Sequence, residues 1–93
     1  MTEHFFSNEF LLASKLLNEV ADGTLSGEEA LKKWPFKPKS MTGDILAAWT
    51  AISHFSDDDD IRRRDEDYSV RRIRELQHLA ERLFSRGTET RRA

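Results

Sequence analysis

The chemically richest stretch of the chain is HFSDDDDIRRRDEDY, residues 54–68. It holds six aspartates within eleven residues, and carboxylate oxygens are the ligands that calcium and magnesium prefer. Three adjacent arginines would repel a cation, however, and no glycine between Gly43 and Gly87 supplies the tight bend of a calcium loop. We therefore expect no metal site, and nothing else in the sequence indicates a cofactor.

The same run also has a purely structural interpretation as a short helix over residues 57–64. Three pairs place an acid four residues before a base, the order that stabilises a helix. These pairs are Asp58–Arg62, Asp59–Arg63 and Asp60–Arg64. We expect Ser56 or Asp57 to cap this helix and Asp65 to cap the next one. Ile61 is expected to be its only apolar anchor, with the charges left in solvent.

A third hypothesis makes this charged region a surface that binds another protein. A block of aspartates suits a basic partner and speeds association electrostatically. The candidate contact residues are Asp57, Asp58, Asp59, Asp60, Arg62, Arg63, Arg64, Arg71, Arg72 and Arg74. In a homodimer, the arginines at 71–74 would face the aspartates of the second copy, because a two-fold contact must be self-complementary.

Two alternatives use the same charges differently. The acidic patch would suit an inhibitor that masks a basic partner, as the small acidic helical immunity proteins of bacterial toxins do. This is an analogy of architecture, since no motif of those proteins occurs here. The other alternative is a nucleic-acid accessory protein that uses the arginine-rich last helix, although a pI of about 5.9 makes nucleic acid an unfavoured partner.

Catalytic motifs are missing, so we expect the chain not to be an enzyme. It has no cysteine nucleophile, no G-x-S-x-G elbow and no phosphate-binding loop. Ser53 and His54 are adjacent, so on a helix they point about 100° apart and cannot act on each other. The absence of cysteine, of a basic leader in MTEHFFSNEF and of a long apolar run predicts a cytoplasmic protein that does not enter membranes.

The elements that must position these residues are helices. Glycine, proline and β-branched residues are few, and apolar residues recur at helical spacing. The expected helices cover residues 7–22, 26–34, 42–55 and 66–86. Ser26 and Glu29 form a capping box at the start of the second helix. Trp34 and Phe36, in the proline-containing connector, are expected to fold back onto the core.

Ninety-three residues are enough for one small domain. The prediction is an all-α fold, a small four-helix bundle, irregular or antiparallel, with an extra short helix near 57–64. Residues 1–86 are expected to form this single domain. Gly87 is expected to end the last helix and to begin a flexible tail over residues 87–93.

Overall fold

The computed structural model describes the backbone of residues 2–41 and 43–89, and the side chains of residues 9–41 and 43–87. Within these residues the chain forms five α-helices and one 3-10 helix, and no β-strand. The elements are α1 (Thr2–Ala21), α2 (Gly27–Lys32), η1 (Pro38–Ser40), α3 (Gly43–Asp57), α4 (Asp59–Arg64) and α5 (Glu66–Glu89). The predicted all-α bundle is confirmed, including the extra short helix.

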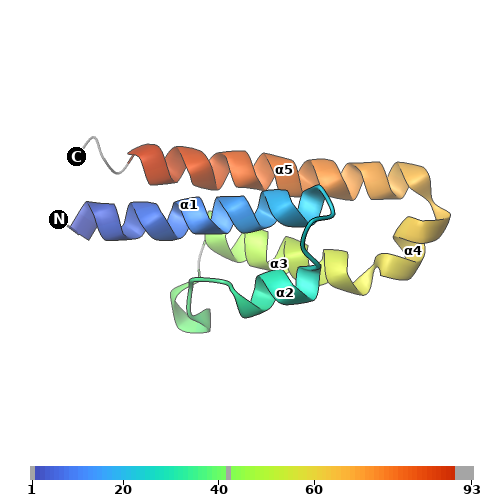
Figure 1. The fold of residues 1–93 in the computed structure, drawn as a ribbon, viewed down its shortest axis with the longest axis horizontal. Coiled ribbons are helices and arrows are strands. Elements are labelled where there is room, and N and C mark those ends of the chain that lie inside the picture. Colours follow the sequence, from blue (N-terminus) through green and yellow to red (C-terminus); the bar gives the residue numbers. More distant parts are fainter. Residues whose placement is uncertain (1, 42, 90–93) are drawn as a thin grey trace.

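Two long antiparallel helices, α1 and α5, lie side by side and form the body of the molecule (Figure 1). Helix α3 packs against α5, and α2 packs against α3, so these two helices form a second layer under the long pair. Helix α4 closes the end at which α3 turns back into α5. The molecule is elongated, with extents of 47 × 22 × 22 Å.

The core lies where α1, α3 and α5 meet. Its largest fully buried side chains are Leu17, Ile52, Leu76 and Leu83. Burying one such side chain stabilises a fold by about 1.5–3 kcal/mol. The buried polar residue Ser14 is satisfied, because its hydroxyl donates a hydrogen bond of 2.7 Å to the carbonyl of Ala80. The two long helices are thus joined by hydrocarbon packing with one buried hydrogen bond from a side chain.

Helix α2 begins with one of the two hydrogen bonds of the predicted capping box, since the Glu29 carboxylate lies 4.0 Å from Lys32 Nζ instead of bonding back to Ser26. The Ser26 hydroxyl accepts a hydrogen bond of 3.1 Å from the backbone N–H of Glu29. Gly27 follows at a point of close approach, since a Cβ there would lie 3.0 Å from the Cβ of Ser56. The missing side chain therefore lets α2 pack directly on the end of α3.

The connector after α2 folds back onto the core, as predicted. Trp34 and Phe36 are half-buried against it, and the ring of Phe36 lies 5.6 Å from that of Phe10. The indole N–H of Trp34 is buried without an acceptor in the described part of the chain. An unpaired buried donor costs free energy, so it offsets part of the gain from packing this ring.

The end of α5 differs from the prediction, because Gly87 does not end the helix. Helix α5 continues to Glu89, and Gly87 is buried against α1. A Cβ at Gly87 would lie 3.1 Å from side-chain atoms of both Phe10 and Leu11, so glycine here allows α1 and α5 to come close. Residues 90–93 of the predicted tail lie outside the described residues, and the division into a 1–86 domain and a tail stays a prediction.

Candidate functional site

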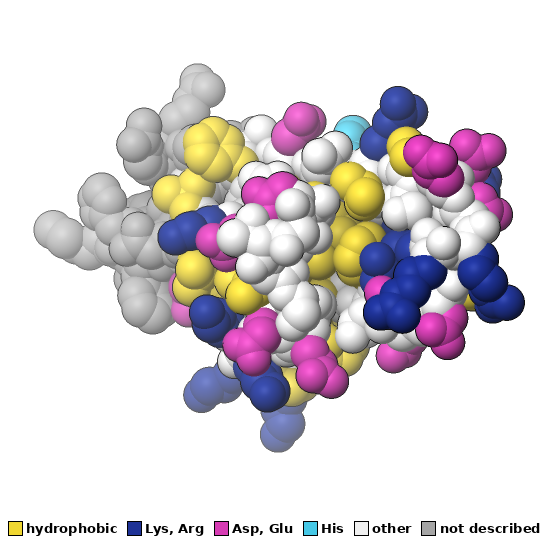
Figure 2. Space-filling model, turned by 45° about the vertical axis from the view of Figure 1, so that its right-hand side comes forward, with side chains coloured by type: hydrophobic (Ala, Val, Ile, Leu, Met, Phe, Trp, Pro, Cys, Tyr) yellow, Lys and Arg dark blue, Asp and Glu magenta, His cyan; other side chains and the backbone are white. Residues whose placement is uncertain are grey.

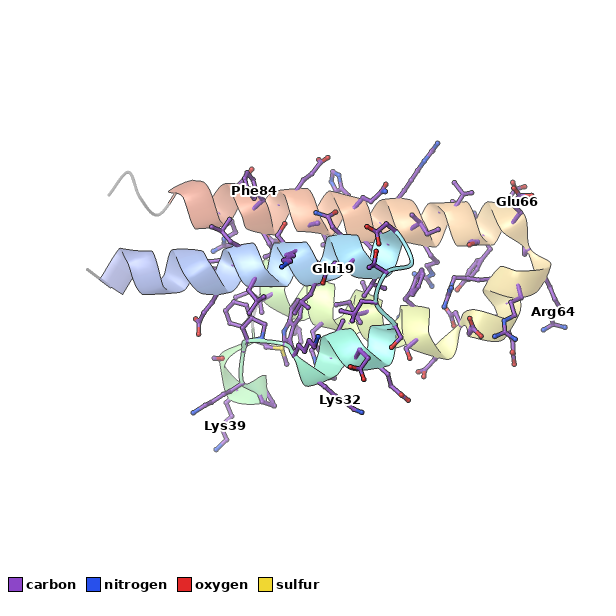
Figure 3. All side chains as sticks on the ribbon, viewed as in Figure 1. Glu19, Lys32, Lys39, Arg64, Glu66 and Phe84 are labelled. Atoms are coloured by element: carbon purple, nitrogen blue, oxygen red, sulfur yellow. The ribbon has the colours of Figure 1, made fainter. Side chains whose placement is uncertain are left out.

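The charged run of the sequence lies at one end of the molecule. We call α4 together with Asp57 and the first three turns of α5, residues 57–75, the charged end. All ten predicted contact residues belong to it. Figure 2 turns this end toward the viewer and shows basic and acidic side chains crowded together on its right-hand side. In Figure 3, Arg64 and Glu66 point outward at the tip of this end.

Arg62 attaches α4 to the rest of the molecule. Its guanidinium carbon lies 3.5 Å from the centre of the Phe55 ring, and Nη2 donates a hydrogen bond to the Phe55 carbonyl. The Arg62 side chain is only 15% exposed, whereas Ile61 is 43% exposed. The prediction that Ile61 anchors this helix is therefore wrong. A planar cation on an aliphatic stem covers the aromatic ring better than the branched side chain, which points into solvent.

Asp58 connects α4 to α5 rather than pairing within its own helix. The hydroxyl of Tyr68 donates a hydrogen bond to Asp58 Oδ2, and Arg72 Nη2 lies 3.6 Å from the same oxygen. Arg72 Nε also donates to the Tyr68 hydroxyl oxygen at 3.0 Å, and Nη1 donates to Glu75 Oε1 at 2.9 Å. The bond to Tyr68, and then that to Glu75, raise the pKa of Arg72. This four-residue network fixes the angle between α4 and α5.

One of the three predicted acid–base pairs forms. Arg63 Nη2 lies 2.9 Å from Asp59 Oδ2, and the two side chains are 74% and 49% exposed. Asp58 contacts Tyr68 and Arg72 of α5 instead of pairing with Arg62. Arg64 Nε donates to the backbone carbonyl of Asp60, at 3.4 Å, rather than to its carboxylate. The spacing of a self-paired helix is present. Two of the six side chains, Asp58 and Arg62, instead contact α5 and α3.

Of the two caps predicted for this region, one forms and the other does not. Asp65 caps α5 as expected, because its Oδ1 accepts a hydrogen bond of 3.1 Å from the backbone N–H of Tyr68. At the start of α4 the cap position is Asp58, not Ser56 or Asp57, and its side chain makes no capping hydrogen bond. Its carboxylate is already used by Tyr68 and Arg72, which explains why it does not cap the helix.

Internal pairing leaves the charged end with more free carboxylates than free cations. Four exposed acids have no hydrogen bond or ion pair with the described residues. They are Asp57, Asp60, Glu66 and Asp67. Of the six candidate arginines, Arg62, Arg63 and Arg72 are paired with acids, and Arg64 contacts only a backbone carbonyl. Arg71 and Arg74 are exposed and have no partner among the described residues. The outward surface at the tip, formed by Asp57, α4 and the first turn of α5, is therefore acidic.

Other polar side chains outside the charged run make local contacts or face the solvent. Ser53 donates its hydroxyl proton to the carbonyl of Trp49, one turn earlier, at 3.0 Å. Glu75 and His78 are both exposed on the outside of α5. No group of three or more His, Asp or Glu side chains among the described residues is arranged to hold a metal ion. No described helix has both the length and the apolar character needed to cross a membrane.

Tyr68 and Glu75 are the participants that the sequence did not identify. Each is one helical turn from Arg72, at i−4 and i+3, a spacing that favours side-chain contact. That spacing is the signal that indicates them. The contact with Asp58 has no such signal, because it joins residues of two helices.

The chain matches no protein-family model, no curated protein and no solved structure in the comparisons with known proteins.

Proposed function

We propose that this chain is a non-catalytic protein-binding module that docks through the tip of its charged end. Its partner presents a basic surface. The observation that supports the proposal is the imbalance left after internal pairing, with four unpartnered carboxylates on one exposed tip. The proposal keeps the cytoplasmic location, which a chain without cysteine favours.

The geometry supports such docking in a specific way. The contacts of Arg62 and Arg72 are partly shielded from solvent, so they hold α4 in place without using the outward carboxylates. Carboxylates on a fixed scaffold attract a basic surface from a distance and lose little freedom on contact. An inhibitor that masks a basic partner, the first alternative from the sequence, is one form of this function.

The homodimer hypothesis has less support. It requires Arg71, Arg72 and Arg74 to face the aspartates of a second copy. Arg72 and Asp58 already contact each other within one chain, so only part of the required charge is available. Sedimentation at low and high salt tests the dimer, and a monomer under both conditions would contradict it.

The nucleic-acid hypothesis is similarly weakened by pairing within the chain. Arg86 Nη1 lies 3.4 Å from Asp44, and Arg82 Nη1 lies 3.9 Å from the same carboxylate. The arginine stripe of α5 is therefore partly neutralised by α3. The phosphates of a nucleic acid would have to displace these contacts, and the acidic tip would repel the same phosphates.

The proposal is tested by the rate of association with a partner purified from the native host. In the variant Asp57→Asn/Asp60→Asn, we expect the on-rate at low salt to fall about three- to ten-fold, with little change in the off-rate. The control Glu9→Gln/Glu81→Gln removes the same charge from the α1–α5 body and should change the rate less than two-fold. Equal rates for both variants would contradict the proposal.

A further inference from the structure

A surface cleft of about 690 Å³ lies beside the charged end, where the turn between α1 and α2 faces the junction of α3 and α4. Its volume is in the range of sites that bind small groups. Figure 2 shows hydrophobic side chains at the surface next to the basic and acidic side chains on its right-hand side. The position makes the cleft continuous with the acidic tip, because Asp59 and Arg62 of α4 belong to its lining.

The apolar part of the cleft comes from α1, α3, α5 and the turn between α1 and α2. Val20 and Phe55 are buried, and Leu25 and Ile73 are partly buried against the core. The walls are held by two contacts described above, the approach of Gly27 to Ser56 and the stacking of Arg62 on Phe55. The cleft is therefore preformed and offers a hydrocarbon surface to an incoming group.

The charge of the cleft is negative. Asp22, Glu28 and Asp59 belong to its lining, whereas Arg62 is its one basic lining residue. Arg62 Nη2 already contacts the Phe55 carbonyl and lies 3.6 Å from Asp59, while the buried Nε has no hydrogen-bond partner among the described residues. Glu28 is exposed and has no partner among the described residues. Asp22 accepts hydrogen bonds from the hydroxyl and the N–H of Thr24, which lower its pKa and keep it ionised.

We infer that this cleft receives a lysine or arginine side chain of the basic partner. The aliphatic stem lies on Leu25 and Ile73, the partly exposed apolar lining residues, and the cationic head meets Glu28 and Asp22. Lysine and arginine side chains have an apolar stem and a positive end, which complement the apolar and acidic lining residues of the cleft. An anionic group would meet three carboxylates, and an uncharged apolar group would leave Glu28 desolvated without a partner. The inference rests on the proposed function, since it specifies how that partner is held.

The test uses hexaarginine as the probe and the full, ¹⁵N-labelled chain at low ionic strength, followed by NMR. We expect the backbone signals of residues 22–28 and of Ser56 to shift on titration, with no such shift for hexacitrulline, which lacks the charge. Glu28→Lys should raise the dissociation constant for hexaarginine about five-fold, the loss of affinity expected when one exposed ion pair is replaced by a repulsion. Glu29→Lys is the matched control, because Glu29 is the next residue of α2 but does not line the cleft. It should weaken binding less than two-fold.

Two other outcomes would distinguish a failure of the cleft from a failure of the proposed docking function. Shifts confined to α4 and the first turn of α5, with equal affinities for the two variants, would overturn the cleft while leaving the acidic tip as a docking surface. No shift anywhere in the chain would overturn both. Circular dichroism of each variant checks that it keeps its helical fold, so that the loss of an NMR shift reports a loss of binding.

Discussion

The α1–α5 body and the charged end are held together by different forces. In the body, leucines such as Leu17 and Leu83 are completely buried, and the contact between the helices is apolar. At the charged end, Arg62 stacks on a ring and Arg72 contacts an acid and a hydroxyl, so the contacts are polar and only partly shielded from solvent. In the proposed function, stability and docking belong to separate parts of the molecule. Exposed ion pairs add only modest free energy to folding, and the unpaired carboxylates beside them stay available to a partner.

The largest effect should come from the body. Leu17→Ala removes a fully buried side chain between α1 and its neighbours, so we expect a loss of about 2–5 kcal/mol in the free energy of unfolding. The control Leu12→Ala makes the same chemical change on the same helix at a site that is 42% exposed, and should cost less than about 0.5 kcal/mol. Denaturant unfolding followed by circular dichroism measures both. Similar losses would show that the body is not the main source of stability.

An intermediate effect is expected at the junction of α3 and α4. Arg62→Ala removes the stacking on Phe55 and the hydrogen bond to its carbonyl, at a cost of about 1–2 kcal/mol in the free energy of unfolding. Ile61→Ala, one residue earlier, should stay within about 0.5 kcal/mol of the wild-type value, because Ile61 is exposed. A larger loss for Ile61 than for Arg62 would restore the anchor predicted from the sequence.

The smallest effect should be a pH dependence at the turn after α1. The pKa of Asp22 is lowered, first by the Thr24 hydroxyl and then by the Thr24 N–H. A group whose folded pKa is lowered stabilises the fold fully above its unfolded pKa, here 3.8, and this contribution is lost as the pH falls through the folded value. Asp22→Asn should therefore lower the melting temperature slightly at pH 7 and less at pH 3. An equal change at both pH values would contradict the assignment.

The sequence predicts well whatever depends on neighbouring residues. The caps at Ser26 and Asp65 form as expected, because a cap is decided by a side chain and an N–H three residues later. The apolar spacing likewise identifies the helices, since burial of one face repeats every turn. Gly87 is the exception, because the rule that glycine ends a helix does not include the close approach of another helix.

The candidate site was predictable in its position but not in its pairing. The charges mark residues 57–74 plainly, yet the partners of Asp58 and Arg62 are set by how α4 turns against α3 and α5. A pattern along one helix contains no information on that angle. Hydropathy also favours Ile61 over Arg62, whereas the actual contact uses the flat face of a guanidinium.

The contact of Gly87 with Phe10 and Leu11 has a practical consequence for handling the protein. It holds the first turns of α1 beside the last turns of α5, at the end of a 47 Å body that is farthest from α4 (Figure 1). A fluorophore or a sensor-chip linkage placed on this end of α1 or α5 would thus leave α4 unobstructed. Fluorophores on both helices at this end would report, by energy transfer, whether α1 and α5 stay packed together.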